Sequence, residues 1–245
     1  MHRFFVNPAQ IGTQTITLLD DQARQIADVL RLRVGERIGV LDNLGWLYEV
    51  GLTAVHRRQV TGEIVGKTAV DTEPTTHITL YQSILKRDKF EWVLQKGSEI
   101  GISRFVPVIT ERSLAQHGKD NKYDRWQRIL TEAAEQAERG ISPELAEACS
   151  FAQALAAAQT ADLALIAWAR EKEARLSTCL APLKQQPTSR VALFTGPEGG
   201  FSPAEIDQAR QVNVSPITLG PRILRTETAA MVATAFILYD LEIGD

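Results

Sequence analysis

The chain is poor in the residues that metal centres and disulfide frameworks need. Its 245 residues include only two cysteines, Cys149 and Cys179, and four histidines. The cysteines are far apart in the sequence and have no histidine at ligand spacing, so neither a zinc site nor a disulfide framework is expected. We therefore predict no metal and interpret both cysteines as small core residues.

Long apolar runs are also missing. No stretch approaches the roughly 18 consecutive apolar residues of a membrane helix, and the N-terminal Met-His-Arg-Phe-Phe lacks the apolar segment of a signal peptide. These features predict a cytoplasmic protein with no membrane partner. Hydrophobic residues still make up 44% of the chain and charged residues 23%. This composition supports a buried core and excludes a disordered chain.

An overall positive charge is lacking as well. The formal net charge of −3 argues, taken alone, against a nucleic-acid partner. The charges are unevenly distributed, however, because residues 84–128 carry ten Lys and Arg but only six Asp and Glu. A local basic segment of this kind can contact RNA phosphates even in an acidic protein. RNA therefore remains a candidate partner.

The sequence pattern changes near residue 72. The preceding part has short β-like runs, one amphipathic piece at residues 20–30, and a hairpin signal at residues 42–45. Residues 71–76 are polar, contain Pro74 and show no apolar period. We predict a small barrel over residues 1–72 and a second domain over residues 73–245. The expected barrel strands are Ile38–Leu41, Leu47–Leu52 and Val60–Val65.

Strands and helices alternate in the second part. This order is typical of a largely parallel sheet covered by helices, so the fold class is α/β. The expected strands are His77–Ile84, Phe105–Ile109, Leu163–Ala167, Val191–Thr195 and Pro216–Leu219, and the expected helices are Phe90–Ile100, Lys122–Glu138, Ala152–Ala161 and Ala229–Leu241.

Two strand–loop–helix units near the C-terminus are the most informative feature. One strand runs into Gly-Pro-Glu-Gly-Gly-Phe at residues 196–201, and Ser202, Pro203 and Glu205 form a helix-start signal. The next strand runs into Gly-Pro-Arg-Ile-Leu-Arg-Thr-Glu-Thr at residues 220–228. Loops at the carboxyl edge of an open α/β sheet bind ligands. An isolated glycine turn is more often purely structural, and that reading stays open here.

The loop sequences narrow the class of ligand. Neither a phosphate-binding P-loop nor a dinucleotide Gly-x-Gly-x-x-Gly pattern is present, and Glu198 would repel a phosphate. An adenine ring with a cationic centre fits better, because backbone groups can hydrogen-bond the base and a carboxylate tolerates positive charge.

Together, the segments at residues 196–202 and 219–229 resemble the signature of the RsmE-type ribosomal RNA methyltransferases of the SPOUT superfamily, which methylate N3 of a uridine in 16S rRNA. Upstream segments agree with the resemblance: residues 29–35, residues 86–101, Glu111-Arg112-Ser113, Glu135-Gln136, Arg139 and Pro143. The resemblance covers nearly the whole chain. One departure is Gln25, where family members commonly have a histidine; a neutral amide cannot act there as an acid or base near neutral pH.

The resemblance implies a PUA-like N-terminal β-barrel that binds RNA and a SPOUT domain with a deep trefoil knot. It also implies S-adenosylmethionine as cofactor, 16S rRNA within the small ribosomal subunit as partner, and a homodimer. The implied cofactor-binding residues are Thr195, Gly196, Gly200, Leu219, Gly220, Ile223, Leu224 and Thr226.

Two residues are candidates for catalysis. Arg225 would face the uracil and stabilise its N3-deprotonated form through its oxygens, although a salt bridge to Glu227 or Glu198 is an equally open reading. Glu198 is the carboxylate nearest in sequence, yet it could instead cap amides of its own loop. The candidate RNA contacts are Arg3, Arg31, Arg33, Lys86, Arg87, Lys89 and Lys96.

Two other functions compete with this one. The chain could be an RNA-binding module whose SPOUT domain only dimerises, although the intact glycine loops and Arg225 argue against that. It could also be a SPOUT enzyme that modifies a different RNA position, which the loop sequences do not exclude.

Overall fold

The protein is described by a computed structural model that covers residues 1–86, 88–113 and 121–243. Arg87 lies outside the described residues. The chain divides into two compact units: Met1–Glu73 with Thr131–Ser142, and Pro74–Leu130 with Pro143–Asp245. The first unit therefore contains residues 131–142 in addition to the expected range 1–72.

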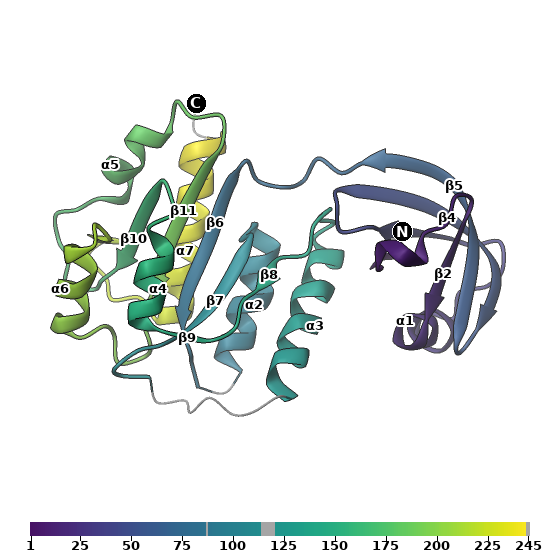
Figure 1. Cartoon of the computed structure of the whole chain (residues 1–245), viewed down its shortest axis with the longest axis horizontal. Helices are drawn as coiled ribbons and strands as arrows, with labels where there is room; N and C mark the ends of the chain where they lie inside the picture. Colours follow the sequence, from purple (N-terminus) through teal and green to yellow (C-terminus); the bar gives the residue numbers. More distant parts are fainter. Residues whose placement is uncertain (87, 114–120, 244–245) are drawn as a thin grey trace. The chain divides into compact units, whose positions relative to one another are not determined.

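The described residues of the first unit form a curled five-stranded sheet with the order β1-β3-β4-β5-β2 (Figure 1). Strands β3, β4 and β5 confirm the three expected strands, whereas β1 and β2 were not predicted. The amphipathic piece at residues 20–30 forms α1, followed directly by a π-helical turn, η2, that starts at the exposed Gln25. The elements are β1 (Arg3–Phe5), η1 (Pro8–Gln10), β2 (Thr15–Leu19), α1 (Asp20–Arg24), η2 (Gln25–Val29), β3 (Arg37–Leu41), β4 (Trp46–His56) and β5 (Gln59–Ala69).

The predicted hairpin turn joins β3 to β4. Asn43 and Gly45 have φ angles of 61° and 88°, the left-handed region that these residues tolerate best. The buried Asp42 carboxylate accepts the N–H groups of Leu44 at 2.8 Å and Trp46 at 3.1 Å. The side chain thus stabilises the turn by satisfying backbone donors.

Polar contacts tie residues 131–142 to the first unit. The Arg139 guanidinium pairs with Glu73 at 2.6 Å, and Glu135 accepts the N–H of Phe5 at 2.8 Å. Burial raises the pKa of Glu135 to about 7; the Phe5 N–H opposes this rise, and the charge of Glu132 adds to it. These contacts explain why a segment far along the chain belongs to this unit.

The second unit, as far as the structure describes it, has a seven-stranded parallel sheet with the order β12-β10-β11-β6-β7-β8; β9 pairs with β7. The predicted largely parallel α/β sheet is confirmed. Its elements are β6 (Thr76–Ser83), α2 (Lys89–Ile100), β7 (Arg104–Ile109), α3 (Asn121–Gln136, which continues into the first unit), β8 (Glu144–Leu145), β9 (Cys149–Ser150), α4 (Phe151–Ala158), β10 (Leu163–Ala167), α5 (Leu176–Leu180), η3 (Ala181–Leu183), β11 (Ser189–Thr195), α6 (Pro203–Gln211), β12 (Ser215–Ile217), α7 (Thr226–Leu238) and η4 (Tyr239–Ile243).

Apolar side chains alternate across this sheet, as the two-residue period of a strand requires. In β11, Val191 and Leu193 pack into the core shared with α2 and α7, whereas Ala192 and Phe194 pack into the core shared with α4 and α6. Both faces of the sheet are therefore covered by helices (Figure 1). Within the described residues, no helix is long and apolar enough to cross a bilayer.

Candidate active site

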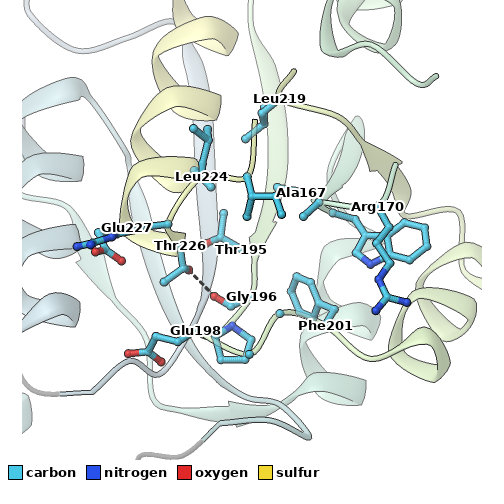
Figure 2. A pocket seen from close by; sticks show the side chains of 18 of the residues that line it. Ala167, Arg170, Thr195, Gly196, Glu198, Phe201, Leu219, Leu224, Thr226 and Glu227 are labelled. Atoms are coloured by element: carbon cyan, nitrogen blue, oxygen red, sulfur yellow. Dashed lines mark hydrogen bonds between the residues drawn. The ribbon is translucent and has the colours of Figure 1, made fainter. Parts of the chain in front are cut away.

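A pocket of about 380 Å³ lies at the carboxyl edge of the parallel sheet. Three segments surround it: residues 167–170 at the end of β10 and beyond, residues 195–201 at the end of β11 and beyond, and residues 218–227, which run from the loop after β12 into α7 (Figure 2). Lys89, Arg112 and Ala229 complete its lining. Since β10, β11 and β12 are neighbouring parallel strands, their carboxyl ends bring these loops together.

The first glycine loop is shaped by its own backbone. Gly200 has a φ of 67°, a left-handed conformation that strains any residue with a Cβ atom. A Cβ atom on Gly196 would come within 3.1 Å of the Phe201 ring. The loop ends at Ser202, which caps α6 in a capping box with Glu205, as predicted. Glycine is thus favoured at both positions, for different reasons.

The second glycine loop leads into helix α7. Gly220 has a φ of 106° and donates its N–H to Thr218 Oγ1 at 3.2 Å. Arg225 occupies the N-cap position with extended backbone, and α7 begins at Thr226, three residues earlier than expected. The start of α7 therefore lies inside the pocket lining.

One buried glutamine connects the two glycine loops. Gln82, at the end of β6, is fully buried and accepts the hydroxyl of Thr195 at 2.6 Å. Its amide nitrogen donates to the Gly196 carbonyl and to Thr226 Oγ1, each at 3.4 Å. Thr226 also donates its hydroxyl directly to the Gly196 carbonyl, as the dashed line in Figure 2 marks. These bonds fix the backbone on one wall of the pocket.

Two glutamates share one lysine at the pocket. Lys89 Nζ lies 3.7 Å from Glu198 Oε1 and 3.8 Å from Glu227 Oε1. Glu198 also accepts the N–H of Lys86 at 3.2 Å, and among the described residues no amide of its own loop donates to its carboxylate, as one reading had allowed. In Figure 2, Glu198 and Glu227 lie on one side of Gly196 and Thr226, and Ala167 and Arg170 lie on the other. The acidic part of the pocket is thus separate from the loop after β10.

The structure brings together all eight candidate cofactor residues and both candidate catalytic residues. Each lines the pocket, although Ile223 is 85% exposed. Arg225 is exposed and, among the described residues, forms no ion pair with Glu227 or Glu198, so the salt-bridge reading is wrong for this structure. The residues are Thr195, Gly196, Glu198, Gly200, Leu219, Gly220, Ile223, Leu224, Arg225 and Thr226.

The candidate RNA residues are dispersed. Lys89 lies in the pocket lining, whereas Lys86 and Lys96 are outside it, and Lys96 pairs with Glu99 at 2.7 Å. In the first unit, Arg3 pairs with Glu138 at 2.8 Å. The remaining two, Arg31 and Arg33, are exposed in the first unit, and Arg31 has a φ of 55°.

Sequence reasoning missed the loop after β10, Arg112 after β7, and Gln82. The strand at residues 163–167 was predicted, and the rule that ligands bind at carboxyl ends of parallel strands could have identified Trp168 and Arg170. Gln82 gives no such signal, because its partners come from segments more than a hundred residues away. In the described residues, no group of three or more His, Cys, Asp and Glu is placed to hold a metal ion.

Known proteins are similar to this chain in both sequence and fold. Residues 72–238 match the model of the RNA methyltransferase domain family. The chain is 36% identical to the ribosomal RNA small subunit methyltransferase E of Synechocystis, covering 96% of this chain and 76% of that protein. It is 30% identical to the protein of the same name from Bacillus subtilis, covering 99% of this chain and 98% of that one.

A solved structure is similar to this chain over nearly its whole length. The crystal structure of a ribosomal RNA small subunit methyltransferase E from Neisseria gonorrhoeae bound to S-adenosyl methionine superposes with a TM-score of 0.86 at 31% identity, covering 97% of this chain and 96% of that chain. The pattern of two glycine loops at one sheet edge is thus accompanied by full-length similarity. The chain belongs to the ribosomal RNA small subunit methyltransferase E family of RNA methyltransferases.

Proposed function

We propose that the protein transfers a methyl group from S-adenosylmethionine to N3 of a uridine in 16S rRNA. The observation that carries the proposal is the pocket formed by the two glycine loops, which contains every residue expected to contact the cofactor. Relatives named as small subunit rRNA methyltransferases, one of them bound to S-adenosyl methionine, support methylation of rRNA with this cofactor.

The pocket residues fit this cofactor. Leu219 and Leu224 offer apolar surface for the adenosyl group, while Gly196, Gly200 and Gly220 permit close approach of the backbone. The carboxylates of Glu198 and Glu227 tolerate a positively charged ligand. When bound, the cofactor supplies an electrophilic methyl group on its sulfonium sulfur.

Arg225 is the proposed catalytic residue. It is exposed at the start of α7, and its guanidinium can donate to the uracil oxygens and stabilise negative charge as N3 loses its proton. Glu198 is the second proposed catalytic residue, and its carboxylate, which pairs with Lys89, would accept the proton that N3 releases. Since positioning dominates a direct methyl displacement, the fixed loop backbone contributes as much as any side chain.

Finer features of the fold are part of the proposal. The final segment passes from β12 through residues 218–225 to α7, which packs against α2 and β6. This path is compatible with the trefoil knot of SPOUT enzymes, and the curled first sheet is compatible with a PUA-like RNA-binding barrel. A homodimer is proposed because Phe236 on α7 and Tyr239 just beyond it are 57% and 59% exposed.

The RNA-binding part of the proposal assigns phosphate contacts to Arg3, Arg31 and Arg33 of the first unit and to the basic residues near α2. The substrate is 16S rRNA within the small ribosomal subunit, and the proposal includes a cytoplasmic location. Such contacts weaken steeply as salt is added.

Nucleoside mass spectrometry of 16S rRNA from a deletion strain tests the reaction. We expect N3-methyluridine to disappear and to return when the gene is restored. Persistence of this nucleoside in the deletion strain contradicts the proposal, and loss of a different methylated nucleoside indicates another RNA position.

Calorimetry with S-adenosylmethionine tests the remaining alternative, an RNA-binding module without catalysis. We expect saturable binding with the purified protein. Failure to bind at high micromolar concentration would exclude the enzymatic reading, whatever the RNA affinity.

A further inference from the structure

Four arginines from three different loops line the same pocket. Arg112 follows β7, Arg170 follows β10, and Arg222 and Arg225 lie between β12 and α7. All four are exposed. A chain with a net charge of −3 thus concentrates arginine around one opening.

The acids nearby do not neutralise these arginines. Glu198 and Glu227, the two acidic residues of the lining, both interact with Lys89. Glu171, which follows Arg170 in sequence, accepts backbone N–H groups of residues 172–174 and pairs with Arg210 at 3.8 Å. In the part of the chain that the structure describes, none of the four arginines forms an ion pair.

Their side chains are therefore available to an anionic ligand. Arg112 uses one nitrogen, Nη1, to donate to the Gly199 carbonyl at 3.1 Å, which fixes it beside the first glycine loop. Guanidinium groups bind phosphate through two parallel hydrogen bonds and are weakly hydrated, so they suit the phosphates of RNA. A base held in the pocket needs its flanking phosphates anchored outside it, because the base must leave its stack to react.

We propose that Arg112, Arg170 and Arg222 form a phosphate-binding rim that holds the RNA backbone on either side of the target nucleotide. This inference rests on the proposed function and adds the RNA contact surface at the pocket itself. It assigns the main phosphate contacts near the reacting base to residues other than the seven expected from the sequence. Arg225 keeps its proposed role of contacting the uracil base.

The test compares the variants Arg170→Gln and Arg222→Gln with the wild type. Binding to small ribosomal subunits from the deletion strain is measured between roughly 50 and 200 mM KCl by cosedimentation. Each variant is expected to reduce the slope of log K against log[KCl] by about 0.7 to 1, the loss of one phosphate contact. Arg112 is not changed, since its bond to Gly199 would confound the result.

Arg190→Gln is the matched control. Arg190 is in the same unit, its side chain is 63% exposed, and it pairs with Asp162 at 3.4 Å away from the pocket. This variant should keep the wild-type salt slope. Cofactor affinity, measured by calorimetry, should stay within about twofold of the wild type in all three variants.

Two results would contradict the proposed phosphate-binding rim. One is an unchanged salt slope in both variants while the wild type methylates RNA. The other is a loss of cofactor affinity with RNA binding intact, which would assign these arginines to the cofactor's carboxylate. A wild-type protein that binds the cofactor but methylates no RNA would instead contradict the proposed function.

Discussion

The hydroxyl of Thr226, the first residue of α7, donates a hydrogen bond to the carbonyl of Gly196, the first residue after β11. This bond joins two glycine loops that are separated by an entire helix and strand. Gln82 reinforces the junction from a third segment. The shape of the pocket therefore depends on a small buried polar network, and not only on the loops that line it.

Removing the Thr226 hydroxyl should weaken cofactor binding. Thr226→Val keeps the side-chain shape but leaves Gly196 with only the 3.4 Å bond from Gln82. A lost hydrogen bond of about 1 kcal/mol corresponds to roughly fivefold weaker binding, measured by calorimetry. Thr234→Val is the control on the same helix, because the buried Thr234 hydroxyl has no hydrogen-bond partner among the described residues. Equal effects of the two substitutions would contradict the role of the network.

Gly196→Val should abolish cofactor binding while RNA affinity stays nearly unchanged. A Cβ atom at this position already lies 3.1 Å from the Phe201 ring, and the two further methyl groups must extend into the loop or the pocket. Gly66→Ala, where the nearest atom to a new Cβ is 3.6 Å away, should bind the cofactor normally. Cofactor binding by the Gly196 variant with wild-type affinity would show that the loop does not contact the cofactor closely.

Arg225→Ala should reduce turnover more than cofactor affinity. If the guanidinium acts on the developing negative charge of the uracil, the loss in kcat is on the order of 100-fold. Arg225→Lys should recover little of this, because an ammonium lacks the paired donors. The measurement is single-turnover methylation together with calorimetric cofactor affinity. Equal losses in both quantities would make Arg225 a binding residue.

Glu135 should make stability depend on pH. Its pKa is raised from 4.5 to about 7 in the folded protein, so the folded state holds a proton that the unfolded state releases. The resulting stabilisation is full below about pH 4.5 and is lost as pH rises through 7. Glu135→Gln, which keeps an acceptor for Phe5 N–H, should be more stable than the wild type at pH 8 by about 1–3 kcal/mol and similar to it near pH 5.

Chemical denaturation at several pH values measures this difference. Glu63→Gln is the control, since it removes an exposed carboxylate from a strand of the same unit. It should leave the pH dependence as in the wild type. A Glu135 variant whose stability follows the wild-type curve across this range would rule out the raised pKa.

The parallel sheet was predictable because apolar, strand-like runs alternate with helical segments along the sequence. The runs at residues 163–167 and 191–195 match β10 and the end of β11, and the loops after β11 and β12 carry their own glycine signals. Short strands are too short to show a recognisable pattern in the sequence. Strand β1 has only three residues, and pairing with β3 determines its extended conformation.

Long-range contacts were not predictable from local pattern. The first residues of the segment 131–142 belong to the predicted helix that ends at Glu138. An ion pair and hydrogen bonds with Glu73, Asn43 and Phe5 nevertheless assign the whole segment to the first unit. Gln82 likewise appears in the sequence as only one of several polar residues in the strand Thr76–Ser83. Its function emerges only once β6 and β11 lie side by side.

The carboxylate of Glu205 does more than start α6. One oxygen accepts the N–H of Ser202 at 2.8 Å, and the other accepts the N–H of Glu111 at 2.9 Å, next to Arg112. A single buried side chain therefore sets both the exit of the first glycine loop and the turn that follows β7. Retargeting the enzyme to another RNA would require the glycine-loop exit and the turn after β7 to be redesigned together. Glu205 hydrogen-bonds the backbone of both turns, so exchanging one of them disturbs the other.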